Sequence, residues 1–280
     1  MSPDNPAPAA PPSGPDRAVV SVSALTRRFG PLVAVDGATL QVQRGEMFGL
    51  IGPNGAGKST LVKMLTTLLP PSSGSARVAG FDIHTQQAEV RRSIGYVPQL
   101  LSADGELTGY ENLLLSARLY LLPHGERERR IDQALATMGL QDVRDRLVGT
   151  YSGGMIRRLE IAQSALHRPQ VIFMDEPTIG LDPTARHAVW GHVRSLRAAY
   201  GTSIVLTTHQ MEEADTLCDR IGVIHAGHLV AVGTPRELKA RVGEGATLDD
   251  VFASLTGAAL DMRGDYRHVR EERRGAREHG

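Results

Sequence analysis

The nine residues GPNGAGKST, at positions 52–60, constrain the fold of this chain more than any other stretch of its sequence. They follow the apolar run at 47–51, which has the composition of a buried central strand. They lead into STLVKMLTTLL, a helical pattern that is stopped by Pro70 and Pro71. The later apolar strands VIFMD and SIVLTTH are each followed by helix-like sequence, so we expect an α/β fold around a mainly parallel sheet.

The loop itself has the spacing of a phosphate-binding loop, which ends in glycine, lysine and serine. Its glycines let backbone N–H groups turn toward phosphate oxygens, and the helix behind it adds the positive end of its dipole. Lys58 can reach the β- and γ-phosphates, and the Ser59 hydroxyl can bind Mg²⁺. The sequence therefore predicts a P-loop NTPase core that binds a nucleotide through Gly52, Pro53, Asn54, Gly55, Ala56, Gly57, Lys58, Ser59 and Thr60.

Hydrolysis of a bound nucleotide also needs a carboxylate that positions the metal and a group that orients water. The sequence VIFMDEP supplies both candidates, because Asp175 ends a wholly apolar strand and Glu176 follows at once. We expect Asp175 to hold the Mg²⁺ shell and Glu176 to polarise the attacking water as general base.

A second glycine-rich segment, YSGGM at 151–155, precedes the helical pattern IRRLEIAQSAL. It makes another helix N-terminus that is suited to an anion. One chain cannot easily bring two such helix starts onto one γ-phosphate, whereas two chains packed head to tail can. The phosphate-binding loop is therefore predicted to be incomplete without a second copy of the chain.

The rest of the sequence divides into segments of different character. VVSVSALTRRF and LVAVDGATLQV predict an antiparallel β subdomain, and RIGVIHAGHLVAVGT predicts a hairpin. Residues 106–148, including DVRDRLV, have helical periodicity and predict an inserted helical subdomain. We expect a disordered Pro-rich tail at 1–17, a nucleotide-binding domain at 18–235, a C-terminal extension at 236–260 and a disordered charged tail at 261–280.

Charge and composition argue against several classes of function. The 31 Lys and Arg residues balance 31 Asp and Glu residues, and such a neutral chain is not expected to bind nucleic acid. The single cysteine, Cys218, cannot form an internal disulfide, which predicts a reducing compartment. The sequence shows no secretory signal and no apolar run of about 20 residues. Any role at a membrane is therefore expected to require a partner.

Taken together, these segments resemble the motifs of ABC-type ATPases, the nucleotide-binding subunits of ABC transporters. The resemblance covers about residues 19–233 and keeps the motifs in the family's order. GPNGAGKST resembles the Walker A loop, VIFMDEP the Walker B strand and YSGGM the signature. YVPQ resembles the Q-loop with Gln99, IGLD the D-loop with Asp182, and TTHQMEEAD the switch region with His209. Phe29 lies where the family places an aromatic ring that stacks on adenine.

The resemblance implies that two such domains close head to tail on two ATP molecules. Ser152, Gly153 and Gly154 would then bind the γ-phosphate of the ATP held by the other copy. Gln99 would contact Mg²⁺ and water, together with Ser59 and Asp175, and would sense the membrane partner. His209 would hold the γ-phosphate and Asp182 would organise the interface, which makes Glu176, His209, Gln99 and Lys58 the expected catalytic set.

Finer features resemble the drug-exporter branch of the family, the daunorubicin-resistance type. The features are YSGGM before a basic helix, EPTIGLDP, and the late segment GATLDDVFASLTG. Tyr151, Met155 and Ile179 depart from the general family pattern, and Ile156 interrupts the basic residues that this branch commonly has after SGGM.

The resemblance to the drug-exporter branch leads to an expectation about function. We expect an ATPase at the cytoplasmic face of the membrane that powers export of a hydrophobic drug or antibiotic through a separate permease. The stretch after Gln99 and the 106–148 helices would dock that permease. A soluble ABC ATPase acting on ribosomes or chromosomes, and an importer subunit, remain the alternatives.

Overall fold

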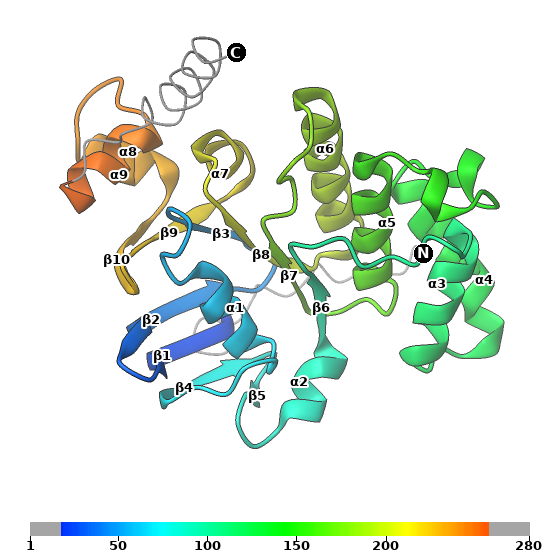
Figure 1. The fold of residues 1–280 in the computed structure, drawn as a ribbon, viewed down its shortest axis with the longest axis horizontal. Coiled ribbons are helices and arrows are strands. Elements are labelled where there is room, and N and C mark those ends of the chain that lie inside the picture. Colours follow the sequence, from blue (N-terminus) through cyan, green and yellow to red (C-terminus); the bar gives the residue numbers. More distant parts are fainter. Residues whose placement is uncertain (1–17, 258–280) are drawn as a thin grey trace, which may run out of the picture.

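The computed structural model describes residues 18–257, and the tails predicted at 1–17 and 261–280 lie outside these residues. Residues 258–260 of the predicted C-terminal extension also lie outside them. Within the described part, the chain forms two sheets with helices between and around them (Figure 1).

The larger sheet contains the buried strands that the apolar runs predict. Its order is β10-β9-β3-β8-β7-β6, and every neighbouring pair is parallel except the terminal hairpin β9–β10. All residues of the three central strands β3, β8 and β7 are buried. The strands are β3 (Met47–Ile51), β6 (Ile94–Val97), β7 (Val171–Asp175), β8 (Ser203–Thr208), β9 (Arg220–His225) and β10 (His228–Gly233).

The smaller sheet is antiparallel, as the alternating N-terminal sequence predicts. Its order is β2-β1-β4-β5. The first two strands are long and one face of each packs on the core, with bulges that interrupt the alternation of buried and exposed side chains in β1. The strands are β1 (Ala18–Phe29), β2 (Leu32–Gln43), β4 (Ser73–Val78) and β5 (Phe81–Asp82).

Helix α1 (Lys58–Leu65) follows the phosphate-binding loop and packs between the two sheets. The prediction that this helix continues to Pro70 is wrong, because it ends one turn earlier. The Thr66 hydroxyl donates to the Val62 carbonyl, and Thr67 adopts a left-handed φ of 61°. The Leu68 N–H then bonds back to the Lys63 carbonyl, which closes the helix end without a proline.

The region 106–148 forms two helices, α3 (Gly109–Leu119) and α4 (His124–Thr137). The segment DVRDRLV does not extend the helical pattern as predicted. It contains only the end of a short 3₁₀ turn, η2 (Gln141–Val143), and the start of another, η3 (Val148–Thr150). Helix α5 (Gly153–Ala165) follows and packs against both α3 and α4.

The remaining helices cover the larger sheet and end the described chain. They are α2 (Gln87–Ser93), α6 (Pro183–Tyr200), α7 (Met211–Leu217), α8 (Pro235–Ala240) and α9 (Leu248–Thr256). Helix α9 buries Leu248, Val251 and Phe252 in the same hydrophobic core as α6 and α7. In Figure 1 the α8–α9 pair and the α3–α4 pair lie at opposite ends of the molecule. None of the helices between residues 18 and 257 has the length and apolar character needed to cross a bilayer.

Candidate active site

The candidate site lies where three parallel strands end. The phosphate-binding loop follows β3, Glu176 follows β7, and His209 follows β8. Because these strands are neighbours in the order β3-β8-β7, their carboxyl ends meet at one edge of the sheet. This edge is where open α/β sheets bind their ligands.

The phosphate-binding loop needs its glycines because the backbone passes close to other backbone. A Cβ atom at Gly52 would lie 2.2 Å from the Ile224 carbonyl oxygen. At Gly57, which has a φ of 107°, a Cβ would lie 2.4 Å from the Ala34 carbonyl oxygen. Gly57 is also the N-cap of α1, and no side chain caps that helix. The first N–H groups of α1 therefore have no side-chain acceptor at the helix start and suit an anion.

Lys58 is buried and folds back over the loop. Its Nζ donates to the Gly52 carbonyl at 2.8 Å and to the Pro53 carbonyl at 3.0 Å. It also forms an ion pair with Glu176 Oε1 at 3.2 Å. The predicted phosphate ligand and the predicted general base are thus direct neighbours.

Asp175 is brought to Ser59 although 116 positions separate them in the sequence. The Ser59 hydroxyl donates to Asp175 Oδ1 at 2.8 Å, and the Thr207 hydroxyl donates to the same oxygen at 2.6 Å. A hydroxyl beside a carboxylate is a set of hard oxygen ligands that fits Mg²⁺. No cluster of three or more His, Cys, Asp or Glu side chains within residues 18–257 could hold a metal alone. The set therefore fits an ion that is also bound by nucleotide phosphates.

Glu176 is held in an unusual backbone conformation at the end of β7. Its φ is 48°, in the left-handed region that non-glycine residues rarely adopt, and its side chain is buried. Its N–H donates to both the carbonyl and the hydroxyl of Thr207, at 3.1 and 3.0 Å. His209 Nδ1 lies 3.1 Å from Glu176 Oε2. The carboxylate is therefore fixed between Lys58 and His209.

Thr207 is a site residue that the sequence analysis missed as such. Its hydroxyl fixes Asp175 and its main chain fixes Glu176. The signal that could have found it is its position two residues before His209 on a strand that runs beside VIFMD.

An open hollow of about 410 Å³ lies in front of the loop. Phe29 borders it, with 44% of its surface exposed and the Arg27 guanidinium 4.6 Å from its ring centre. The hollow has the size of a small-molecule site. Its lining brings together residues from four stretches of the chain, namely Phe29, Leu32, Ala34, Asn54, Gly55, Ala56, Gly57, Lys58, Ser59, Thr60, Gln99 and Glu176.

The structure does not bring the predicted signature and D-loop residues into this hollow. Ser152 is exposed and caps α5 by accepting from the Met155 N–H at 3.3 Å. Asp182 is exposed and caps α6 by accepting from the Ala185 N–H at 2.9 Å. Neither they nor Gly153 and Gly154 line the hollow.

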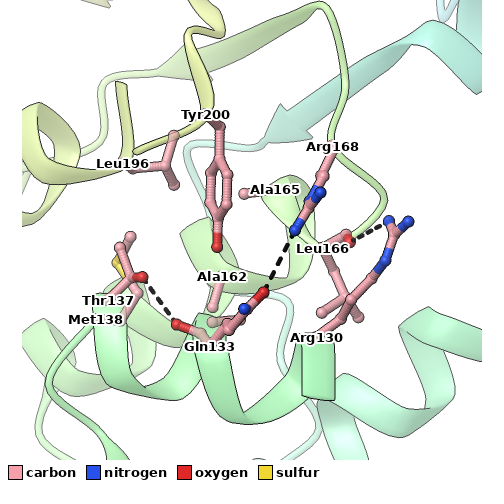
Figure 2. A pocket seen from close by; sticks show the side chains of 11 residues that line it. Arg130, Gln133, Thr137, Met138, Ala162, Ala165, Leu166, Arg168, Leu196 and Tyr200 are labelled. Carbon is pink, nitrogen blue, oxygen red and sulfur yellow. Dashed lines mark hydrogen bonds between the residues drawn. The ribbon is translucent and has the colours of Figure 1, made fainter. Parts of the chain in front are cut away.

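A second hollow, between α4, α5 and α6, is no candidate for the nucleotide (Figure 2). Its enclosed part measures about 10 Å³, which is room for one water molecule at most. Tyr200 and Arg168 are among its lining residues, and Arg168 donates to Gln133 Oε1 at 3.4 Å.

A buried carboxylate connects the segments on both sides of the site. Glu213, on α7, is 1% exposed, and its Oε1 accepts from Thr178 Oγ1 and from Trp190 Nε1, each at 2.8 Å. Burial raises the pKa of Glu213, while hydrogen bonds from Thr208, Thr178 and Trp190 oppose that rise. Thr178 lies two residues after Glu176, and Thr208 directly precedes His209. Sequence reasoning assigned Glu213 no role.

Comparison with known proteins gives one consistent result. A family model described as "ABC transporter" matches residues 35–179. A daunorubicin/doxorubicin resistance ATP-binding protein of Streptomyces peucetius is 47% identical over 82% of this chain and 69% of its own length. A linearmycin resistance ATP-binding protein of Bacillus subtilis is 36% identical over 88% of this chain and 79% of its own length.

A solved ATP-binding subunit of an ABC transporter superposes on the fold with a TM-score of 0.76. It is 33% identical in sequence, and the match covers 85% of this chain and 99% of that one. The α/β core, the antiparallel sheet and the surrounding helices are therefore those of an ABC ATPase domain.

Proposed function

Because the chain belongs to the ABC transporter family of ATP-binding ATPases, we propose that it powers export through a separate membrane-spanning permease. The carrying observation is the packing of Lys58, Ser59, Asp175, Glu176 and His209 at one sheet edge beside the open hollow. This set contains a phosphate ligand, a metal ligand and a general base, as hydrolysis of a nucleoside triphosphate requires.

We propose that ATP lies in the hollow with its adenine against Phe29 and its phosphates on the loop. The Lys58 ammonium then donates to the γ-phosphate in place of the two loop carbonyls to which it donates in this structure. Glu176, fixed by Thr207, takes a proton from the attacking water, and His209 steadies its carboxylate. Ser59, Asp175 and Gln99 would hold Mg²⁺, and a bound Mg²⁺ would supply positive charge at the β- and γ-phosphates.

The exposed signature segment supports a head-to-tail dimer of two copies. Ser152 and Gly153 are exposed, and neither they nor the buried Gly154 line the hollow of their own chain. A helix N-terminus binds anions, so it would complete the γ-phosphate site of a second copy. Asp182, at the exposed start of α6, would lie in the same interface.

Exposed leucines in the two segments that are predicted to dock the permease support such a partner. Leu100 and Leu101 follow Gln99 and are 81% and 49% exposed. Leu115, Leu119 and Leu121, on and after α3, are also exposed. Exposed apolar side chains in these segments fit a surface that another protein covers. The permease would place this chain at the cytoplasmic face of the membrane.

The substrate class comes from the relatives. The similar proteins named above confer daunorubicin, doxorubicin or linearmycin resistance by name. We propose that this chain likewise serves export of a hydrophobic drug or antibiotic.

A substitution at the general base tests this function. Tagged Glu176→Gln protein is expressed in the native host, and ATP and Mg²⁺ are added to the isolated membranes. The membranes are solubilised, and the proteins that co-purify with the tag are identified by mass spectrometry. We expect retained ATP binding, very slow hydrolysis and a multi-span membrane protein in stoichiometric amount.

The matched control is the double variant Glu176→Gln/Lys58→Ala, which lacks the phosphate ligand. For this variant, ATP should not increase the amount of membrane protein that co-purifies. Normal turnover by Glu176→Gln would refute the role of Glu176. Recovery with ribosomal or chromosomal proteins and no membrane subunit would refute the transport function.

A further inference from the structure

The loop that carries Gln99 rests on two buried charged side chains of α5. Arg157 and Glu160 are 2% and 3% exposed. Charged side chains are almost never so buried unless they are paired, because removing them from water costs several kcal/mol. The two do pair with each other, with Arg157 Nη1 2.9 Å from Glu160 Oε2. The other hydrogen bonds that the two side chains make go to the loop.

Arg157 holds the start of this loop by its carbonyl groups. Its Nη1 donates to the Pro98 carbonyl at 2.7 Å, and its Nη2 donates to the Gln99 carbonyl at 2.7 Å. Two short bonds from one planar guanidinium fix both the position and the orientation of the backbone at Gln99.

Glu160 holds the end of the same loop by its N–H groups. Its Oε1 accepts from the Ser102 N–H, from the Ser102 hydroxyl at 3.2 Å and from the Ala103 N–H at 3.3 Å. The side chains between the two anchor points, Leu100 and Leu101, remain exposed. The pair therefore binds the backbone of the loop, and the side chains on the outer face of the loop stay exposed.

The helix that carries Arg157 and Glu160 also carries the signature segment at its N-terminus. Helix α5 has its N-cap at Ser152, and Arg157 and Glu160 follow within its next two turns. Gln99, whose carbonyl Arg157 holds, lines the nucleotide hollow. One helix thus connects the residue that faces the nucleotide with the helix N-terminus that faces outward.

We propose that Arg157 and Glu160 are positioning residues of the ATPase reaction, which fix Gln99 at the nucleotide and tie it to the signature helix. The inference rests on the role proposed above for Gln99. The loop and α5 then move as one body, so a displacement of Leu100 and Leu101 by a docked protein also displaces Ser152.

A mutant cycle with Gln99 tests the inference on the purified chain. The variant Arg157→Met/Glu160→Met removes both charges together, because an apolar pair is tolerated where a single unpaired buried charge is not. We expect kcat for ATP hydrolysis to fall about ten-fold, while the Kd for ATP changes less than about two-fold. In a Gln99→Ala background the same pair of substitutions should lower kcat by less than about two-fold further.

The matched control is Arg158→Met, the next residue of the same helix. Arg158 bonds the Met138 and Gly154 carbonyls and has no hydrogen bond to the Gln99 loop. Its effect on kcat should be the same with and without Gln99→Ala. If circular dichroism shows that the double-methionine protein does not fold, Arg157→Lys replaces it. That variant keeps the charge opposite Glu160 but loses one of the two carbonyl contacts.

Three results would overturn the inference. An unchanged kcat in Arg157→Met/Glu160→Met shows that the pair does not position Gln99 for the reaction. A full ten-fold loss in the Gln99→Ala background shows that the pair acts independently of Gln99. Normal kcat in Gln99→Ala alone removes the role of Gln99 and the inference with it. Failure to find a membrane partner for Glu176→Gln leaves this cycle unaffected, so the two proposals fail separately.

Discussion

Replacing Glu213 by alanine should destabilise the protein strongly, because it removes the acceptor for buried donors. The Thr178 hydroxyl and the Trp190 indole N–H both donate to Glu213 Oε1 at 2.8 Å. A buried donor without a partner costs about 1–3 kcal/mol, so two donors cost about 2–6 kcal/mol. Burial disfavours the charged form of Glu213 and raises its pKa, and the alanine variant no longer has this carboxylate to bury. The loss of that desolvation cost offsets part of the cost of the unpaired donors. We expect a net loss of about 2–5 kcal/mol, which is a large share of a typical unfolding free energy.

The chain contains one tryptophan, Trp190, and that residue is itself a donor to Glu213. Urea unfolding followed by its fluorescence therefore reports both global stability and the broken contact. The variant Glu213→Gln keeps an amide oxygen for both donors and turns its NH₂ group toward Thr208, so it should lose less than about 1.5 kcal/mol.

The matched control is Glu212→Ala, because the neighbouring Glu212 side chain is 65% exposed. Its effect should stay within about 0.5 kcal/mol of the wild type. The reasoning is refuted if Glu213→Ala unfolds within that same margin, or if Glu213→Gln is as unstable as Glu213→Ala.

Three further predictions concern the loop, the hollow and the response to pH. Gly57→Ala places a Cβ at 2.4 Å from a backbone oxygen and keeps a positive φ, so its thermal midpoint should fall by several degrees and ATP binding should be lost. Phe29→Ala should weaken ATP binding about ten-fold by calorimetry, since base–aromatic stacking contributes about 1–3 kcal/mol. Burial lowers the pKa of His167 to about 4, despite an opposing hydrogen bond to Ile94. As the pH falls, His167 is therefore protonated in the unfolded chain before it is protonated in the folded one. The free energy of unfolding should fall by about 3 kcal/mol between pH 6.5 and 4, and this fall should be less steep in His167→Phe.

The sequence was most informative where one residue type has one physical use. The phosphate-binding loop could be predicted because glycines, a lysine and a serine at fixed spacing suit phosphate and metal. The buried strands could be predicted from runs such as VIFMD, all of which is buried. Ser152 is exposed and lies outside the hollow, and its role in a second copy's site stays a prediction.

The sequence failed where long-range contacts or single backbone angles decide the structure. The end of α1 depends on the left-handed φ of Thr67, which no residue preference of threonine indicates. The roles of Thr207, Glu213 and Arg157 depend on partners that are far away in the sequence and become neighbours only through strand order and helix packing. A buried polar residue in an otherwise helical pattern reads as a surface residue until its partners are known.

The strand order of the larger sheet has a consequence for the synthesis of the protein. Strand β8 lies between β3 and β7, yet it follows both in the chain. A nascent chain that has emerged only as far as residue 202 holds the glycine-rich loop and both acidic residues but lacks the strand that joins them. Thr207, which orients Asp175 and Glu176, arrives with that last insertion. The residues of the candidate hydrolytic site can therefore take up their positions only after β8 has been synthesised and has paired with β3 and β7.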